Sequence, residues 1–193
     1  MTQMQDDLAA LDTALAVKGV KITREAGCIE RCHNVPHQGS YSNAAHTYGV
    51  LQLARWLYPA FFGELAPIIL DHDVPERYTG DIPANVLRSS EEVKKACHII
   101  ERSVAQKFGL VPEQAYAAGA PELYAKFKAC DRIELYLWCC EQLEQGNQGV
   151  RGVMFELERV WAKEPPPAPA PAFIRHVQQN GWARLPESLE DIA

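Results

Sequence analysis

Apolar residues recur at intervals of three or four positions along most of this chain, the spacing that places them on one face of an α-helix. In residues 44–57, for example, His46, Val50 and Leu53 share one face. The pattern predicts helices over residues 5–17, 44–57, 61–72, from Ser90 to about Phe108, 121–146 and 150–162. Since no stretch alternates apolar and polar residues for long enough to predict a strand, we expect an all-α fold, a single helical bundle.

The segment EPPPAPAP, residues 164–171, interrupts this pattern. A proline-rich run of this kind favours an extended spacer over a helix. We therefore expect a helical domain over residues 1–163, a Pro/Ala-rich spacer over 164–171, and a C-terminal tail over 172–193 with one short helix. Whether that tail is flexible or docks on the domain stays open at this stage.

Composition narrows the classes of partner and compartment. The 193 residues are 47% hydrophobic and 23% charged, with a net charge of −6 and no run of Lys or Arg, so we expect no nucleic-acid polymer as a partner. The acidic, polar N-terminus is not a secretory signal, and no apolar stretch approaches the ~18 residues needed to span a membrane. The six cysteines follow no disulfide framework. Reduced thiols in a cytoplasmic protein are the expected state.

Two polar residues occupy positions where the helical pattern predicts apolar ones. Asp131 lies in an aromatic stripe between Phe127 and Trp138, and His46 lies on the apolar face of residues 44–57. A buried carboxylate costs several kcal/mol unless something pairs with it. Taken singly, each residue is best explained as a hydrogen-bonded core group.

A third polar feature changes that interpretation. The stretch LDHDVPERYTGDIP places His72 and Asp73 directly after a hydrophobic run, at a predicted helix end. Together with His46 and Asp131 they supply two imidazoles and two carboxylates. Such a set suits one divalent ion, with cobalt, manganese, zinc, nickel, iron and magnesium all possible. An ion would neutralise the carboxylates and so explain acids on an apolar face.

Three segments also carry a family resemblance: NAAHTYGV, HDVPERYTGDIP and KACDRIELYLWCCEQLEQGN. The second is close to the pattern H-D-x-x-E-x-x-T-G-D-x-P. Over roughly residues 25–160 the chain resembles the HD-domain phosphohydrolases, most of all the bacterial 5′-deoxynucleotidases and their phage relatives. This resemblance implies an HD-type domain whose metal ligands are His46, His72, Asp73 and Asp131.

The resemblance also implies roles for four residues around the ion. Glu76 is expected in the outer shell, positioning the attacking water or passing a proton, and Asp81 is expected to contact a sugar hydroxyl. Arg31, fifteen residues before His46, stands where the family carries a phosphate-binding arginine. Lys128, one helical turn before Asp131, is a second candidate for the phosphate.

At two places the chain departs from the family pattern. The deoxynucleotidases have a tryptophan after the arginine, whereas this chain has Cys32, followed by His33 and Asn34. The family lysine after the Gly-Asp-x-Pro turn is missing, and Arg88 could substitute for it. We therefore count Cys32, Asn34 and Arg88 among the candidate substrate-binding residues, where base and sugar would be selected.

The expected reaction is hydrolysis of a 5′-(deoxy)nucleotide, with a deoxynucleoside 5′-monophosphate giving a deoxynucleoside and phosphate. One alternative is a phage-type deoxynucleoside triphosphohydrolase, acting on a substrate such as dATP and releasing triphosphate. Arg77, Arg88 and Lys95 could then serve the longer phosphate chain. A less favoured alternative is a non-catalytic HD module that binds nucleotide. Members of this class commonly form dimers or larger assemblies, so we expect a homo-oligomer.

A different class of site is a structural zinc module in CIERCHNVPH. This segment holds four potential ligands in ten residues: Cys28, Cys32, His33 and His37. Paired cysteines of zinc knuckles tolerate such spacing. However, the second pair follows immediately and leaves no loop to wrap a tetrahedral ion, so we expect the HD site instead.

Overall fold

The computed structural model describes residues 3–182, with side chains from residue 13 onward. Its helices are α1 (Gln3–Ala26), α2 (Asn43–Leu57), α3 (Phe62–Asp71), α4 (Glu76–Thr79), α5 (Ala84–Ser89), α6 (Glu91–Phe108), α7 (Glu113–Gly119), α8 (Pro121–Glu144), α9 (Arg151–Lys163) and α10 (Ala170–Asn180), with 3₁₀ turns at Pro59–Phe61 and Gln148–Val150. In this part of the chain the only β-type pairing is an isolated bridge between Glu30 and Ser42. The all-α prediction is confirmed.

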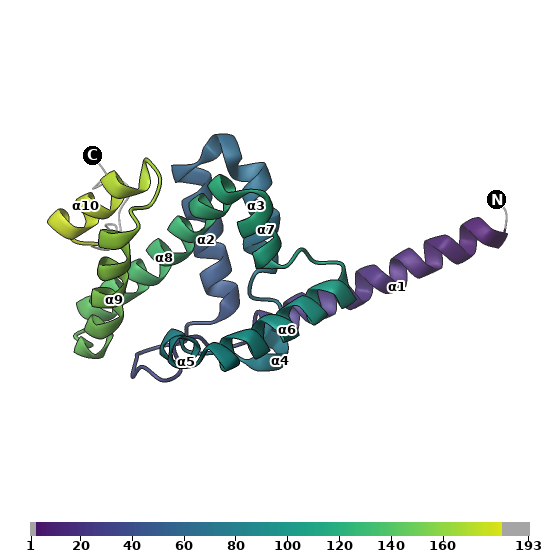
Figure 1. The fold of residues 1–193 in the computed structure, drawn as a ribbon, viewed down its shortest axis with the longest axis horizontal. Coiled ribbons are helices and arrows are strands. Elements are labelled where there is room, and N and C mark those ends of the chain that lie inside the picture. The colour runs from purple at the N-terminus through teal and green to yellow at the C-terminus, as the bar shows by residue number, and fades with distance from the viewer. Residues whose placement is uncertain (1–2, 183–193) are drawn as a thin grey trace, which may run out of the picture.

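Helix α8 runs through the middle of the bundle, between α2 and α3 on one side and α9 and α10 on the other (Figure 1). It begins with Pro121, which suits a first turn because the first amides of a helix need no carbonyl partner within it. Phe127, Cys130 and Ile133 are fully buried in the main core, together with Val50 of α2 and Leu65 of α3. This packing holds the middle of α8 against α2 and α3.

The turn between α3 and α4 contains the His-Asp pair. His72 still donates its amide to Ile68 O at 3.0 Å, so it has helical geometry although α3 ends at Asp71. Val74 is buried, and Pro75 precedes the first residue of α4. Gly80 ends α4 with a φ of +69°, a left-handed conformation that favours glycine. The side chains of this turn are therefore fixed by a helix on each side.

Helix α1 is longer than the predicted 5–17 and continues to Ala26. It passes Gly19, which costs ~1 kcal/mol relative to alanine. Ile22 and Ala26 offset that cost because they are buried against Val74 and Val104. The part of α1 before these contacts projects away from the bundle (Figure 1). The prediction ended too early because the buried partners lie far along the chain.

The spacer predicted over residues 164–171 is shorter than expected, since α10 already begins at Ala170. Proline in a first helical turn removes no hydrogen bond, so the run can end inside a helix. Ala170, Ile174 and Val177 are buried in the main core, and the Tyr58 hydroxyl donates to Pro167 O at 2.8 Å. Of the two alternatives for the tail, docking is therefore the one found for residues 170–180. Residues 183–193 lie outside the described part.

Candidate active site

Three helices bring the metal-ligand candidates together. His46 lies in the first turns of α2, where Ser42 Oγ caps the helix by accepting from Ala45 N at 3.3 Å. His72 follows α3, and Asp131 lies in the middle of α8. Ligand atoms of His46, His72 and Asp131 all lie within 4.8 Å of one another. We call these three residues and the adjacent Asp73 the metal corner.

Both imidazoles of the metal corner present the same ring nitrogen. His72 Nδ1 lies 2.7 Å from Ile69 O and donates to it, which leaves Nε2 facing the corner. That Nε2 is buried and makes no hydrogen bond, although Asp73 Oδ2 lies 3.0 Å from it. His46 Nδ1 contacts Glu134, and its Nε2 lies 3.1 Å from Asp131 Oδ1. The two Nε2 atoms thus converge on one point.

The charges around this point favour a cation. Burial alone would lower the pKa of His72, but nearby Asp73 outweighs it and raises this pKa to about 9. Burial likewise opposes ionisation of Asp131, yet Lys128 Nζ at 2.5 Å from Asp131 Oδ2 holds the carboxyl pKa well below its usual range. Asp73 has a lowered pKa because His72 and Arg31 outweigh its burial.

The donor set fits a divalent metal ion. Two imidazole nitrogens and a carboxylate oxygen are ligands that first-row ions accept, and the unpartnered His72 Nε2 is a buried atom that a metal would satisfy. Asp73 lies beside this cluster, with Oδ2 at 3.8 Å from His46 Nε2 and 2.5 Å from Arg31 Nη1. His46, His72 and Asp131 would hold the ion, with Asp73 as the next available ligand.

Glu76 lies next to the metal corner on α4. Asn43 Nδ2 donates to Glu76 Oε2 at 2.7 Å, and Asn43 Oδ1 accepts from Arg31 Nη1 at 3.2 Å. Burial and the neighbouring carboxylate of Asp73 raise the pKa of Glu76 to about 8. A carboxyl group with a pKa near neutrality is suited to transferring protons.

Two cations contact the carboxylates of the corner. Arg31, from the loop before α2, contacts Asp73, and Lys128 of α8 contacts Asp131. Glu113 of α7 lies 3.6 Å from Lys128 Nζ, so Lys128 is paired with two carboxylates. Guanidinium and ammonium groups placed this way can bind phosphate oxygens next to an ion.

The metal corner opens into a cleft of about 1150 Å³. Its outer wall contains the remaining substrate candidates, which we name together: Cys32, Asn34, Asp81 and Arg88. Asp81 Oδ2 accepts from Cys32 N at 2.8 Å, and Cys32 has a φ of +52°, unusual for a residue with a side chain. Burial raises the pKa of the Cys32 thiol to about 11, so this cysteine is a neutral group of the wall. Arg88 is half exposed, with Nη1 3.9 Å from Glu156 of α9.

Comparison with known proteins assigns the chain to a family. A family model described as 5′-deoxynucleotidase YfbR-like matches residues 26–177. The chain belongs to this family. It is thus a nucleotide phosphohydrolase, as the motifs predicted.

The curated relatives match the chain at low sequence identity but over about two thirds of its length. The 5′-deoxynucleotidase YfbR of Salmonella typhi is 26% identical over 140 residues, which cover 67% of this chain and 70% of the relative. A 5′-deoxynucleotidase of Cronobacter sakazakii is 27% identical over 144 residues, or 69% and 72% of the two chains. Among solved structures, the cyanophage S-2L HD phosphohydrolase DatZ, bound to dA and one catalytic Zn²⁺ ion, matches with a TM-score of 0.57 and 19% identity. That match covers 83% of this chain and 96% of DatZ, and it shows a shared fold.

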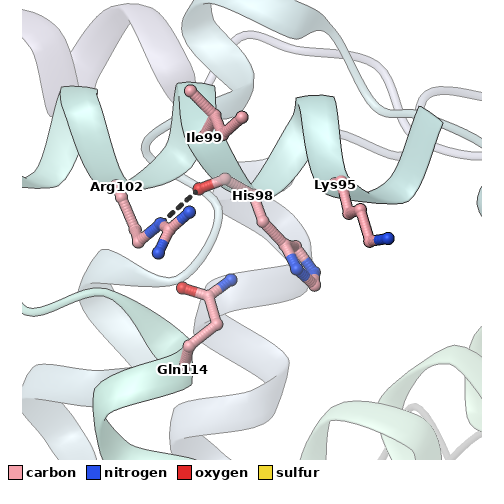
Figure 2. Close-up of a pocket in the computed structure, with 5 residues that line it drawn as sticks. All are labelled: Lys95, His98, Ile99, Arg102 and Gln114. Atoms are coloured by element: carbon pink, nitrogen blue, oxygen red, sulfur yellow. Dashed lines mark hydrogen bonds between the residues drawn. The ribbon is translucent and has the colours of Figure 1, made fainter. Parts of the chain in front are cut away.

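A smaller hollow of about 320 Å³ lies between α6 and α7, outside the metal corner. Figure 2 shows Lys95, His98 and Arg102 along one side of α6, with Gln114 of α7 facing them. Lys95 therefore lines this hollow and not the main cleft. Arg77 is also elsewhere, since its Nε donates to Glu25 of α1 at 2.7 Å.

The structure does not bring the four potential ligands of the zinc-module alternative together. Among the described residues, the one group of three or more ligand atoms within 4.8 Å of one another is that of His46, His72 and Asp131. Cys28 is exposed and directs its thiol to Arg24 O. In the same part of the chain, no helix combines the length and apolarity needed to cross a bilayer.

Four site residues escaped the sequence analysis: Tyr41, Asn43, Glu113 and Glu134. Asn43 and Glu134 each lie three residues from a predicted ligand on the same helix, a spacing that places them on the ligand's face. That spacing was a usable signal. Tyr41 and Glu113 come from separate segments, and nothing in the local sequence marks them.

Proposed function

We propose that this protein hydrolyses deoxynucleoside 5′-monophosphates to deoxynucleosides and inorganic phosphate. The supporting observation is the convergence of His46, His72 and Asp131 within 4.8 Å, flanked by Arg31 and Lys128. The names of the curated relatives, both 5′-deoxynucleotidases, favour this substrate class.

Each neighbouring residue has a task that follows from its chemistry. A bound divalent ion supplies Lewis acidity toward a phosphoryl oxygen and lowers the pKa of water. Arg31 and Lys128 bind the phosphate and offset the charge that grows on its oxygens during attack. Glu76, with a pKa near 8, moves the proton between water and leaving group. Asn43 holds Glu76 and Arg31 in one orientation through its two amide atoms.

The outer wall is proposed to hold the sugar and base. The Asp81 carboxylate accepts a hydrogen bond from a sugar hydroxyl, in addition to the one that it accepts from Cys32 N. Cys32, Asn34 and Arg88 line the cleft beyond it. Cys32 has less surface than a tryptophan for stacking, so we expect base discrimination in this protein to be weak.

Two of the cations named for a longer phosphate chain, Arg77 and Lys95, are directed elsewhere. Arg88 is the remaining member of that set in the cleft, where Lys94 and Arg132 also lie, and it faces Glu156. The names of the curated relatives, both 5′-deoxynucleotidases, therefore carry the preference for a monophosphate over the triphosphate alternative. The non-catalytic alternative is disfavoured because the ligands, Glu76, Arg31 and Lys128 are all retained.

The decisive experiment measures release of phosphate, pyrophosphate and triphosphate from a panel of deoxy- and ribonucleoside mono-, di- and triphosphates. The protein is first stripped with a chelator and then loaded separately with cobalt, manganese, zinc, nickel, iron or magnesium. We expect phosphate from deoxynucleoside monophosphates, with activity restored by at least one ion. Triphosphate release as the main product would overturn the proposal.

Two properties of the whole protein belong to this proposal. We place it in the cytoplasm, because all six cysteines are unpaired and a nucleotide substrate is found there. We also propose a homo-oligomer, a dimer or larger. Analytical ultracentrifugation of the full chain tests the assembly, and a sedimenting monomer at micromolar concentration would contradict it.

A further inference from the structure

His46 is held at its outer ring nitrogen by Glu134, a residue to which the family resemblance assigned no role. The imidazole is fully buried, and its Nδ1 contacts Glu134 Oε2 on the next turn of α8 after Asp131. The Tyr41 hydroxyl donates to the same carboxylate oxygen and lies 3.2 Å from His46 Nδ1. Glu134 is thus shared between a candidate metal ligand and a buried phenol.

This contact determines which nitrogen of His46 carries the proton. An ionised carboxylate only accepts hydrogen bonds, so Nδ1 must be the protonated nitrogen facing Glu134. The Nε2 lone pair is then directed to the metal corner, 3.1 Å from Asp131 Oδ1. Carboxylates behind ligating histidines fix the ring orientation and increase the basicity of the ligand.

A glycine on α2 leaves the space that Glu134 occupies. A Cβ at position 49 would lie 2.6 Å from Glu134 Cγ and 3.0 Å from its Oε1, closer than packed atoms allow. Gly49 lies inside α2, where alanine would favour the helix. The missing side chain is therefore accounted for by the close approach of Glu134.

The other partner of Glu134 is fixed by the core. The Tyr41 ring stacks on Trp138, with centroids 4.5 Å apart and planes 13° from parallel. Tyr41 is buried, so its hydroxyl needs a partner and has one in Glu134. Tyr41 and His46 thus both contact Glu134 Oε2, which leaves the carboxylate little freedom to rotate away.

From these contacts we infer that Glu134 is a positioning residue for the metal site: it orients His46 as a ligand through Nδ1, and Gly49 is small in order to admit it. The inference deepens the proposed function and rests on it, since it concerns the same ion. It predicts that metal affinity depends on Glu134 although Glu134 does not touch the ion.

The test measures the affinity of the full chain for Zn²⁺ and Mn²⁺ by competition with a chromogenic chelator. Glu134→Ala should weaken binding ~10–100-fold, the range observed when such supporting groups are removed. Glu134→Gln, which keeps the size and one acceptor oxygen, should restore part of that loss. Glu144→Ala, at an exposed position of the same helix, is the matched control and should bind as wild type does. Circular dichroism confirms that each variant compared is folded.

A double-mutant cycle with Gly49 separates ring positioning from general packing. Gly49→Ala should weaken metal binding in the wild-type background, because its methyl group displaces Glu134. The same substitution should change nothing further in the Glu134→Ala background, where the space is free. If Glu134→Ala does not fold, Glu134→Gln and Gly49→Ala alone carry the test.

Each possible result of these measurements either supports or overturns the inference. Weaker binding in Glu134→Ala with partial recovery in Glu134→Gln supports the inference, even if the wild type shows no nucleotidase activity. Wild-type affinity in Glu134→Ala overturns the inference and leaves the proposed function standing. An equal effect of Gly49→Ala in both backgrounds also overturns it. A wild-type chain that binds neither ion overturns the inference and the proposed function together.

Discussion

The metal corner and the outer wall of the cleft are built in opposite ways. In the metal corner, buried or partly buried side chains from α2, from the turn after α3 and from α8 lie close together, and His46, His72 and Asp131 each have a supporting partner behind them. On the outer wall, Arg88 is half exposed and its nearest charged partner lies 3.9 Å away on α9. From this difference we expect the proposed site to constrain the reacting phosphate strongly and the distant end of the substrate weakly.

The largest effect is expected in the metal corner. His72→Ala removes a ligand and leaves buried carboxylates without it, so metal and turnover should both be lost. We expect a fall in kcat of at least ~10³-fold, since the ion supplies several kcal/mol. Colorimetric phosphate release and metal analysis after chelation and reloading check this. His176→Ala, at an exposed position of α10, should match wild type. Full turnover by His72→Ala in reloaded buffer would remove the metal corner from the mechanism.

The next largest effect is expected at Glu76, the residue proposed to carry the proton. Glu76→Gln keeps the hydrogen bond with Asn43 available but cannot exchange a proton, so kcat should fall ~10²–10⁴-fold with metal still bound. Steady-state kinetics and metal stoichiometry separate these two quantities. Glu122→Gln, on the exposed side of α8, is the control. An unchanged kcat in Glu76→Gln would assign the proton transfer to another group.

A smaller effect is expected at Arg31, which lies between the metal corner and the outer wall. It contacts Asp73 on one side and lines the cleft on the other. Arg31→Ala should lower kcat/KM ~10–100-fold, the value of one charged hydrogen-bonding group. Arg31→Lys should recover little, because lysine lacks the planar fork. Arg55→Ala, exposed on α2, controls for loss of charge. Complete rescue by lysine would mean that Arg31 acts only as a point charge.

The smallest effect is expected on the outer wall. Arg88→Ala removes an exposed side chain whose ion pair is worth ~0–1 kcal/mol, so kcat/KM for monophosphates should change less than ~5-fold. The same kinetics on di- and triphosphates sharpen the comparison. A loss as large as that of Arg31→Ala would show that the outer wall binds substrate as firmly as the metal corner does.

Periodicity predicted the helices that bury a continuous apolar face, and it was least successful where the decisive contacts are distant. Helix α8 was predicted nearly to its ends, because its own residues carry the pattern and the stop signals. The extension of α1 to Ala26 depends on Val74 and Val104, and the docking of α10 depends on α8 and Tyr58. No local window contains those partners.

The same division applies to the site. The His-Asp pair, Glu76 and Asp81 could be named from the sequence because they lie in one short stretch that resembles the family pattern. His46 and Asp131 were named because a polar group on an apolar face needs a reason. Asn43 and Glu134 were missed, although each lies one turn from a named ligand. Their roles become visible only when the facing helix is present.

The sequence by itself determined the chemistry available to this protein: which side chains can bind an ion, a phosphate and a proton. Helix periodicity and the spacing of the motif are local properties of the chain, so they could be read from residue order. Only the tertiary structure decided how those side chains are oriented. The Glu134–His46 contact and the space left by Gly49 arise where α2 meets α8. Such contacts join residues far apart in the chain, and their geometry follows from how two helices pack.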